Sequence, residues 1–222
     1  NSGSSSRDWG FLCKLAGTDG TAQTLEIFDG GHPTNITIGS TGEMIVIGEF
    51  RKSQIDFSNN TTLFLKTPET NSNLKLNNFV AKFSSGLAPV WIEQVRGNSE
   101  GTAEATWVGN NLKLMLNSRY YLAIGTDSID GTTNAVVNMD PATGNVISIV
   151  EAGDFLYGMA SNTTNTFLFT ERAQGNTFSF GSYSIAMPEK FAFFAIDQND
   201  SVQWTEMISS VSIPGMRADV MV

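Results

Sequence analysis

Short apolar runs alternate with turn-forming residues along the whole chain. Asn35–Ile38 and Met44–Phe50 flank the turn Ser40-Thr41-Gly42, and Phe79–Phe83 and Val90–Val95 flank a second turn. Runs of this length with period-two alternation, bounded by Gly, Ser and Asn, are typical of β-strands joined in hairpins. No segment sustains the 3.6-residue period of a helix over about a dozen residues. The pattern predicts an all-β fold of short antiparallel strands.

One short motif recurs along the chain. Its copies are Phe11–Leu15, Phe79–Phe83, Ala135–Met139 and Ala192–Ile196. Successive copies begin 68, 56 and 57 residues apart, and Trp91 and Trp204 each lie twelve residues after the start of a copy. A regular period near this length is typical of a repeat protein, in which each unit is one sheet that buries its apolar faces on its neighbours.

The repeat divides the chain into units of four strands. Complete units are expected at about residues 34–95, 103–150 and 158–207. Residues 9–28 supply only the last two strands of a unit, and residues 211–222 resemble the first two. These half-units can complete a fourth unit within one chain, as a small four-bladed β-propeller ring, or between chains, as an open array. We predict one propeller-like β-repeat domain over residues 9–222, after a Gly/Ser-rich leader, residues 1–8.

Residues 48–95 contain a longer signature. Gly48-Glu49-Phe50 and Ile55-Asp56-Phe57 precede the motif Phe79-Val80-Ala81-Lys82-Phe83, which is followed by Trp91. This succession resembles the bacterial β-propeller repeat family, in which G-x-F and x-D-F stretches precede F-V-A-K and a tryptophan. The match is partial elsewhere, and Asn78 stands where that family usually has Asp. The resemblance implies an extracellular, non-enzymatic scaffold or adhesion role, with no catalytic residues to transfer.

Charge and composition exclude several classes of partner. The chain has 13 Lys and Arg against 22 Asp and Glu, a net charge of −9, with no basic run. Nucleic acids and anionic membranes are recognised by clustered cations, so neither is an expected partner. No apolar run approaches the roughly 20 residues that span a bilayer, and membrane insertion is therefore not expected.

The residues that support catalysis or metal binding are sparse. His32 is the single histidine, which excludes His-based triads and multi-His metal sites. The single Cys13 occupies a motif position, so we expect a buried structural thiol. The oxygen-rich segments 127–131 and 197–200 are candidates for Ca²⁺, although neither matches an EF-hand. The candidate paired carboxylates show no spacing that selects a pair for glycoside hydrolysis, and they are Glu93, Glu104, Asp140, Asp154, Glu171 and Asp197.

We therefore predict neither an enzyme nor a resident cofactor or metal. Sequons for N-glycosylation, expected in turns or loops, occur at Asn35, Asn59, Asn60, Asn162 and Asn199. Trp91 and Trp204 are expected to pack between units because they lie in register within the repeat. Trp9, which lies outside the motif strand, and Tyr120 and Tyr121 are the aromatic candidates for an interface.

Two functional hypotheses follow from these features. The first is a non-enzymatic extracellular or cell-surface module of a fibre or appendage, which forms a homo-oligomer or helical assembly through strand and loop contacts, including the leader. The alternative is a carbohydrate-binding or adhesion propeller module, with exposed aromatic side chains stacking on glycans.

Overall fold

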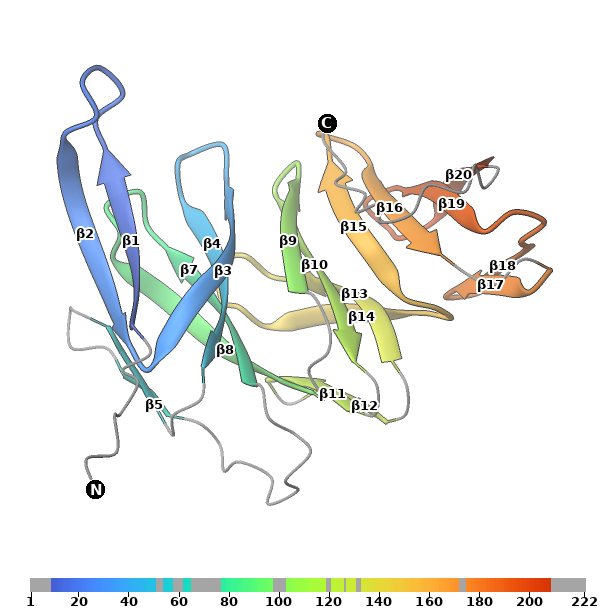
Figure 1. Cartoon of the computed structure of the whole chain (residues 1–222), viewed down its shortest axis with the longest axis horizontal. Coiled ribbons are helices and arrows are strands. Elements are labelled where there is room, and N and C mark those ends of the chain that lie inside the picture. The colour runs from blue at the N-terminus through green and yellow to red at the C-terminus, as the bar shows by residue number, and fades with distance from the viewer. Residues whose placement is uncertain are drawn as a thin grey trace, which may run out of the picture.

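The computed structural model describes residues 9–50, 54–57, 62–64, 77–97, 103–118, 121–125, 127–130, 133–171 and 175–208. This part of the chain is all-β, with antiparallel strands in four sheets and no helix (Figure 1). It accordingly contains no helix that is long and apolar enough to cross a membrane. The predicted all-β class is confirmed.

The four sheets follow one another along the chain and are numbered first to fourth. The first sheet contains β1 (Trp9–Leu15), β2 (Ala22–Asp29), β5 (Gln54–Phe57) and β6 (Thr62–Phe64). The second contains β3 (Gly31–Ile38), β4 (Met44–Phe50), β7 (Asn77–Phe83), β8 (Pro89–Gly97), β11 (Tyr121–Ile124) and β12 (Asp127–Asp130). The third contains β9 (Ala103–Val108), β10 (Asn111–Ser118), β13 (Thr133–Met139), β14 (Val146–Ala152), β17 (Thr177–Phe180) and β18 (Tyr183–Ala186). The fourth contains β15 (Leu156–Ser161), β16 (Thr166–Glu171), β19 (Phe191–Ile196) and β20 (Val202–Ile208).

Each complete unit is a meander of four strands. Unit one is β3-β4-β7-β8, unit two is β9-β10-β13-β14 and unit three is β15-β16-β19-β20, while β1 and β2 form the leading half-unit. Between its second and third strands, each unit inserts a hairpin that pairs with the last strand of the preceding sheet. These hairpins are β5–β6 on β2, β11–β12 on β8, and β17–β18 on β14. Each unit therefore donates a hairpin to the sheet that precedes it.

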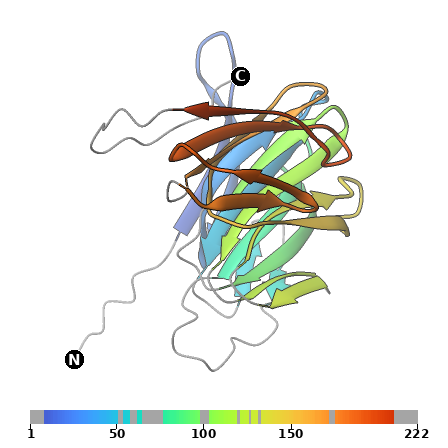
Figure 2. The ribbon, with the colours of Figure 1, turned by 90° about the vertical axis from the view of Figure 1, so that its right-hand side faces the viewer.

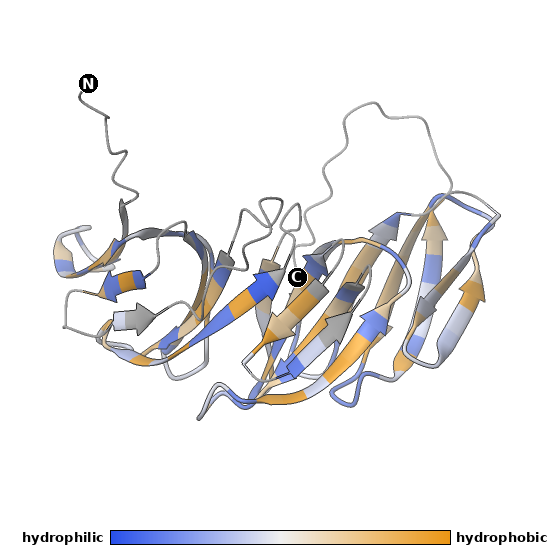
Figure 3. Cartoon of the chain, turned by 90° about the horizontal axis from the view of Figure 1, so that it is seen from below, coloured by the Kyte–Doolittle hydropathy of each residue, from blue (hydrophilic) through white to orange (hydrophobic). Residues whose placement is uncertain are grey.

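Three apolar cores fill the spaces between successive sheets. Phe28 and Phe83 belong to the core between the first and second sheets, Leu114 and Val137 to the next core, and Phe194 to the third. Apolar and polar positions alternate along many strands (Figure 3), because successive side chains of a strand point to opposite faces. The second and third sheets are covered on both faces. Among the described residues, the first and fourth sheets each have a neighbouring sheet on one face only.

On the third strand of a unit, side chains that point to opposite faces pack into two different cores. Phe79, Ala81 and Phe83 on β7 are all fully buried and face the first sheet. Val80 is also fully buried but belongs to the core shared with the third sheet. Alternate residues of this strand therefore pack into two different cores. We call the side of a sheet that faces the preceding sheet its upstream face, and the other side its downstream face.

The first and fourth sheets lie at opposite ends of the long axis (Figure 1). Figure 2, viewed from the right-hand end of Figure 1, shows β19 and β20 in front and the blue strands behind. The expected strand pairing of residues 211–222 and the expected contacts of the leader lie outside the described residues. Ring closure therefore remains a hypothesis.

Two expectations about local structure were wrong. Trp9 does not precede the motif strand but begins β1, where it pairs with Asp29. Residues 127–130 form β12, paired with β11, instead of an oxygen-rich loop. This hairpin is attached by a non-local pairing, that of β11 with β8 of the preceding unit.

Candidate functional site

The upstream face of the first sheet presents exposed apolar side chains. Phe11 and Leu15 on β1 are 65% and 56% exposed, and Leu25 and Ile27 on β2 are 52% and 36% exposed. Phe11 pairs with Ile27 and Cys13 with Leu25, so these side chains form one surface. We call it the upstream end face. Cys13 is exposed, and the expectation of a buried thiol was wrong because no sheet formed by the described residues packs on this face of β1.

The downstream face of the fourth sheet is aromatic. Phe169 stacks on Phe191 at 5.7 Å between ring centroids and contacts Phe193 at 4.7 Å. Tyr157 and Trp204 extend this cluster and are 43% and 47% exposed. We call this surface the downstream end face, and its members are Tyr157, Phe167, Phe169, Phe191, Phe193, Trp204, Glu206 and Ile208. Phe169 is 7% exposed, and Glu206 is an exposed charged residue opposite Phe193.

Both end faces correspond in register to surfaces that are buried inside the chain. The motif residues Phe11, Cys13 and Leu15 occupy the positions that Phe79, Ala81 and Phe83 hold on β7. The same positions are fully buried in the two other copies of the motif. The upstream end face is therefore built like an internal interface that lacks its upstream partner.

The internal interfaces also share a polar contact. The fourth residue of the motif donates a hydrogen bond to the turn between the third and fourth strands of the following unit. The acceptor is a backbone carbonyl in units one and two and the Asp200 carboxylate in unit three. The bonds run from Lys14 Nζ to Ser85 O (3.0 Å), from Lys82 Nζ to Pro141 O (2.9 Å) and from Asn138 Nδ2 to Asp200 Oδ2 (2.5 Å). A hydrogen bond from the same motif position therefore joins each of the first three sheets to the sheet that follows it.

The two in-register tryptophans differ in what covers them. Trp91 pairs with Lys82 on β7, and Trp204 pairs with Ala195 at the same register position on β19. Trp91 is half-buried, donates from Nε1 to Pro141 O at 3.1 Å, and lies against Gly144, where an added Cβ would stand 2.8 Å from the ring. Trp204 is 47% exposed. The expected packing between units is found for Trp91 and is wrong for Trp204 in the single chain.

The turn that covers Trp91 has a structural counterpart at the other end of the molecule. In the β13–β14 turn, Asp140 N–H donates to Asn145 O at 2.8 Å and Gly144 N–H to Asp140 O at 2.8 Å. In the β1–β2 turn, Ala16 N–H donates to Thr21 O at 2.8 Å and Gly20 N–H to Ala16 O at 3.0 Å. Gly144 and Gly20 both have positive φ, which glycine adopts readily. The β1–β2 turn therefore presents the shape that packs on a tryptophan.

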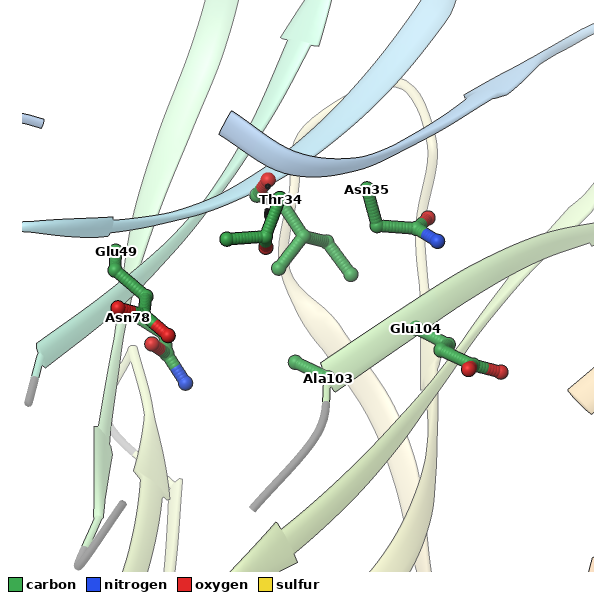
Figure 4. Close-up of a pocket in the computed structure, with 7 residues that line it drawn as sticks. Thr34, Asn35, Glu49, Asn78, Ala103 and Glu104 are labelled. Atoms are coloured by element: carbon green, nitrogen blue, oxygen red, sulfur yellow. Dashed lines mark hydrogen bonds between the residues drawn. The ribbon is translucent and has the colours of Figure 1, made fainter. Parts of the chain in front are cut away.

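A small polar pocket lies between the second and third sheets (Figure 4). Its volume is about 220 Å³, and it is lined by Thr34, Asn35, Ile47, Glu49, Asn78, Ala103 and Glu104. Glu104 accepts the backbone N–H of Met159 at 2.8 Å, so this carboxylate is engaged in linking neighbouring sheets. Asn35 Oδ1 is buried and has no hydrogen-bond partner among the described residues. The pocket offers amide, hydroxyl and carboxylate groups to a small polar ligand.

The remaining candidates from the sequence fall in different settings. Asn162 and Asn199 lie in exposed turns, as expected, whereas Asn35 is half-buried in β3, which contradicts its expected place in a turn or loop. His32 Nε2 lies 3.6 Å from Glu49 Oε2. No group of three or more His, Cys, Asp or Glu side chains able to hold a metal ion occurs in the described part of the chain. Asn59, Asn60 and Tyr120 lie outside the described residues, as do the side chains of Trp9 and Tyr121.

Sequence reasoning missed one polar cluster. Lys113 on β10 is fully buried and contacts Asn138 and Asp200. Its neighbours Leu112 and Leu114 indicate a strand, and alternation alone would place the lysine in solvent. Only the stacking of a further sheet on that face buries it.

Comparisons with family models, with curated proteins and with solved structures found no match to this chain.

Proposed function

We propose that this protein is a non-enzymatic structural module of an extracellular or cell-surface fibre or appendage, with sheets arranged as the blades of a propeller-like repeat. Its subunits join when the downstream end face of one copy packs on the upstream end face of a second copy. The observation that supports this most directly is that both end faces are rich in apolar side chains and correspond in register to buried internal interfaces. Exposed apolar patches of this kind are typical of protein interaction sites.

The internal interfaces supply the geometry of the proposed contact. Trp204 of one copy takes the place of Trp91, and the β1–β2 turn of the second copy takes the place of the β13–β14 turn. Gly17 corresponds to Pro141, so its carbonyl is positioned to accept from Trp204 Nε1. Gly20 corresponds to Gly144 and meets the indole ring, and within the single chain nothing lies within 4 Å of the point where a Cβ on Gly20 would stand.

The symmetry of the contact determines the kind of assembly. The two end faces differ in composition and lie at opposite ends of the molecule, so the contact is head-to-tail. Such a contact forms a filament when its rotation does not close and a ring when it does. The acidic surface, net charge −9, and the exposed sequons at Asn162 and Asn199 are consistent with a secreted protein.

The test is concentration-dependent assembly, followed by light scattering and electron microscopy. Phe11→Asp places a charge in the proposed interface and should abolish assembly, and Trp204→Ala should weaken it. Ile38→Asp is the matched control, because Ile38 is 64% exposed on β3 and lies outside both end faces. All three variants should retain the β-sheet circular dichroism spectrum.

Cys13 provides a second readout because it lies within the upstream end face. A thiol reagent should label it fully in the monomer and slowly in the assembly. A wild-type protein that stays monomeric with Cys13 freely reactive at every concentration would contradict the proposal. Assembly that survives Phe11→Asp would show that the upstream end face is not the contact.

The polar pocket favours a second candidate function, carbohydrate binding. Hydroxyl-rich ligands are bound by amide and carboxylate groups of the kind that line it, and Asn35 Oδ1 offers an unused acceptor. Calorimetric titration of the monomer with a glycan panel tests this function. Binding that is lost in Asn78→Ala and retained in Trp204→Ala would favour the pocket, and the absence of binding to any glycan would exclude it.

A further inference from the structure

Three polar side chains meet in the core between the third and fourth sheets. Lys113 Nζ lies 2.7 Å from Asn138 Oδ1 and 2.5 Å from Asp200 Oδ1, and Asn138 Nδ2 donates to Asp200 Oδ2 at 2.5 Å. Lys113 is fully buried, and Asn138 is 8% exposed. A primary amine, a carboxamide and a carboxylate are therefore in mutual contact away from solvent.

The fold holds these groups in one place. Lys113 on β10 and Asn138 on β13 are direct cross-strand partners, so their side chains leave the same face of the sheet side by side. Asp200 comes from the β19–β20 turn of the next unit and has a φ of 61°, a conformation that Asp tolerates better than most residues. Asn138 Nδ2 also donates to Ser148 Oγ at 2.7 Å, which fixes the plane of the amide.

The cluster differs from its counterparts in the other units. The motif position of Asn138 is held by Lys14 and Lys82, which donate to backbone carbonyls of the following turn. Within the described residues, Lys113 is the one lysine that is buried. A lysine is rarely buried completely unless it is paired, and here one of its partners is the side-chain amide of Asn138.

We propose that Lys113 and Asn138 form an intramolecular isopeptide bond, with Asp200 as the catalytic proton-transfer residue. Asp200 takes one proton from the Lys113 ammonium, and the neutral Nζ attacks Cγ of Asn138. The protonated carboxyl then gives its proton to Nδ2, and the bond between Cγ and Nδ2 breaks as the new bond between Nζ and Cγ is completed. The second proton on Nζ passes to Asp200 and leaves with the released ammonia as ammonium, so the reaction needs no oxidant and no cofactor.

The geometry explains why an unreactive amide becomes a substrate. Holding two reactants in contact replaces a bimolecular encounter and is equivalent to a very high effective concentration. Asp200 contacts both the attacking and the leaving nitrogen, as required of a group that serves first as base and then as acid. Because these groups come from two units, the bond forms only after the third and fourth sheets have packed together.

The product is a covalent link between adjacent strands of one sheet. It joins positions 25 residues apart, and the enclosed segment contains the β11–β12 hairpin that completes the second sheet. Separation of β10 from β13 is then blocked even when hydrogen bonds are lost. The inference stands on this cluster alone and does not depend on assembly of the subunits.

The test is the intact mass of the folded wild-type protein, followed by tryptic mapping. We expect the mass to be lower than the sequence mass by one ammonia, cleavage after Lys113 to be absent, and one branched peptide to join residues 113 and 138. Asp200→Asn, which keeps the hydrogen-bonding shape without an ionisable proton carrier, should retain the full mass. Lys82→Met is the matched control and should show the same loss of ammonia as the wild type.

Each other outcome counts against the proposal. A wild-type mass equal to the sequence mass after prolonged incubation would overturn it. Loss of ammonia without a branched peptide would indicate a succinimide and would overturn it equally. A bond that still forms at an undiminished rate in Asp200→Asn would remove Asp200 from the chemistry. The wild-type map decides the existence of the bond even if a variant does not fold.

Discussion

Truncation of Phe83 to Ala tests the central feature of the fold, the apolar core between successive sheets. The Phe83 side chain is fully buried. Its ring centroid lies 5.8 Å from that of Phe28, in an edge-on arrangement, and 5.9 Å from that of Phe57. Because these two rings belong to the first sheet and Phe83 to the second, truncation removes contacts that join two sheets.

The expected loss of free energy of unfolding follows from the burial of the Phe83 side chain. Removing a fully buried phenylalanine side chain forfeits a transfer free energy of about 1.5–3 kcal/mol. The void that remains raises the cost to about 3–5 kcal/mol, since surrounding side chains relax only partly. Domains are stable by about 5–15 kcal/mol in total, so Phe83→Ala should remove a large share of the free energy of unfolding.

Phe11→Ala is the matched control. Phe11 holds the same motif position on β1 but is 65% exposed, so its truncation in the monomer should change stability by no more than about 0.5 kcal/mol. Urea unfolding followed by circular dichroism measures both variants, with the slope of the transition compared to confirm that the mechanism is unchanged. Equal effects of the two truncations, or a loss below about 1 kcal/mol for Phe83→Ala, would refute the assignment of inner and outer faces.

Three further predictions concern a strand, a turn and the sequons. Gly48→Ala places a Cβ about 2.3 Å from a ring carbon of Phe79 and 2.5 Å from the backbone oxygen of His32. It should lower the free energy of unfolding in urea by about 1–3 kcal/mol. Gly17→Ala is the control and should leave the stability unchanged, because nothing lies within 4 Å of its added Cβ. The pKa of Asp140 is lowered, first by the backbone N–H two residues further along the turn and then by a threonine hydroxyl. The ionised Asp140 carboxylate therefore contributes to the free energy of unfolding above the ordinary Asp pKa of about 3.9, and this contribution is lost as the pH falls through the lowered pKa of the folded state. The difference in free energy of unfolding between wild type and Asp140→Ala should shrink in that range, and a constant difference would contradict this. In a eukaryotic secretory host, Asn162 should carry a glycan and Asn35 should not, as judged by peptide mass before and after deglycosylation; a glycan on Asn35 would contradict its burial.

Much of the fold could be predicted from the sequence because its signals are local. The motif Phe79–Phe83 alternates with period two, and turn residues such as Gly144 separate successive strands. These features predicted the strands of unit one and the place where each unit begins. They act within a few residues of each other, so no knowledge of distant contacts was needed.

The pairing of the inserted hairpins with the preceding sheet could not be predicted in the same way. Ile55 and Phe57 indicate a strand, but nothing in their neighbourhood shows that this strand pairs with β2 of the preceding sheet. Residues 127–130 and 183–186 have weaker apolar alternation, and their strands depend on hydrogen bonds to a neighbouring strand. Pairing partners that are distant in sequence are determined by tertiary structure and not by local propensity.

For the candidate sites, local sequence signals likewise could not predict which side chains are covered by a neighbouring sheet. Trp91 and Trp204 are in register in the repeat, yet one is half-buried under a turn and the other is 47% exposed. Cys13 and Ala81 hold the same motif position, and only Ala81 is buried. A residue's position within a unit predicts which face it lies on, whereas the unit's position in the stack decides whether that face is covered.

Because each unit donates a hairpin to the preceding sheet, the repeating unit of the sequence does not coincide with one sheet of the structure. Unit two contributes four strands to the third sheet, and its inserted hairpin β11–β12 lies on β8 of the second sheet. Unfolding of unit two therefore removes two strands from the second sheet and uncovers the edge of β8, in addition to disrupting the third sheet. In a repeat array whose units meet only through faces, stability is the sum of unit and interface terms and units can open one at a time. Here each interface also includes backbone hydrogen bonds between units, so opening one unit disrupts its upstream neighbour, and this coupling favours unfolding of the stack as a single cooperative body.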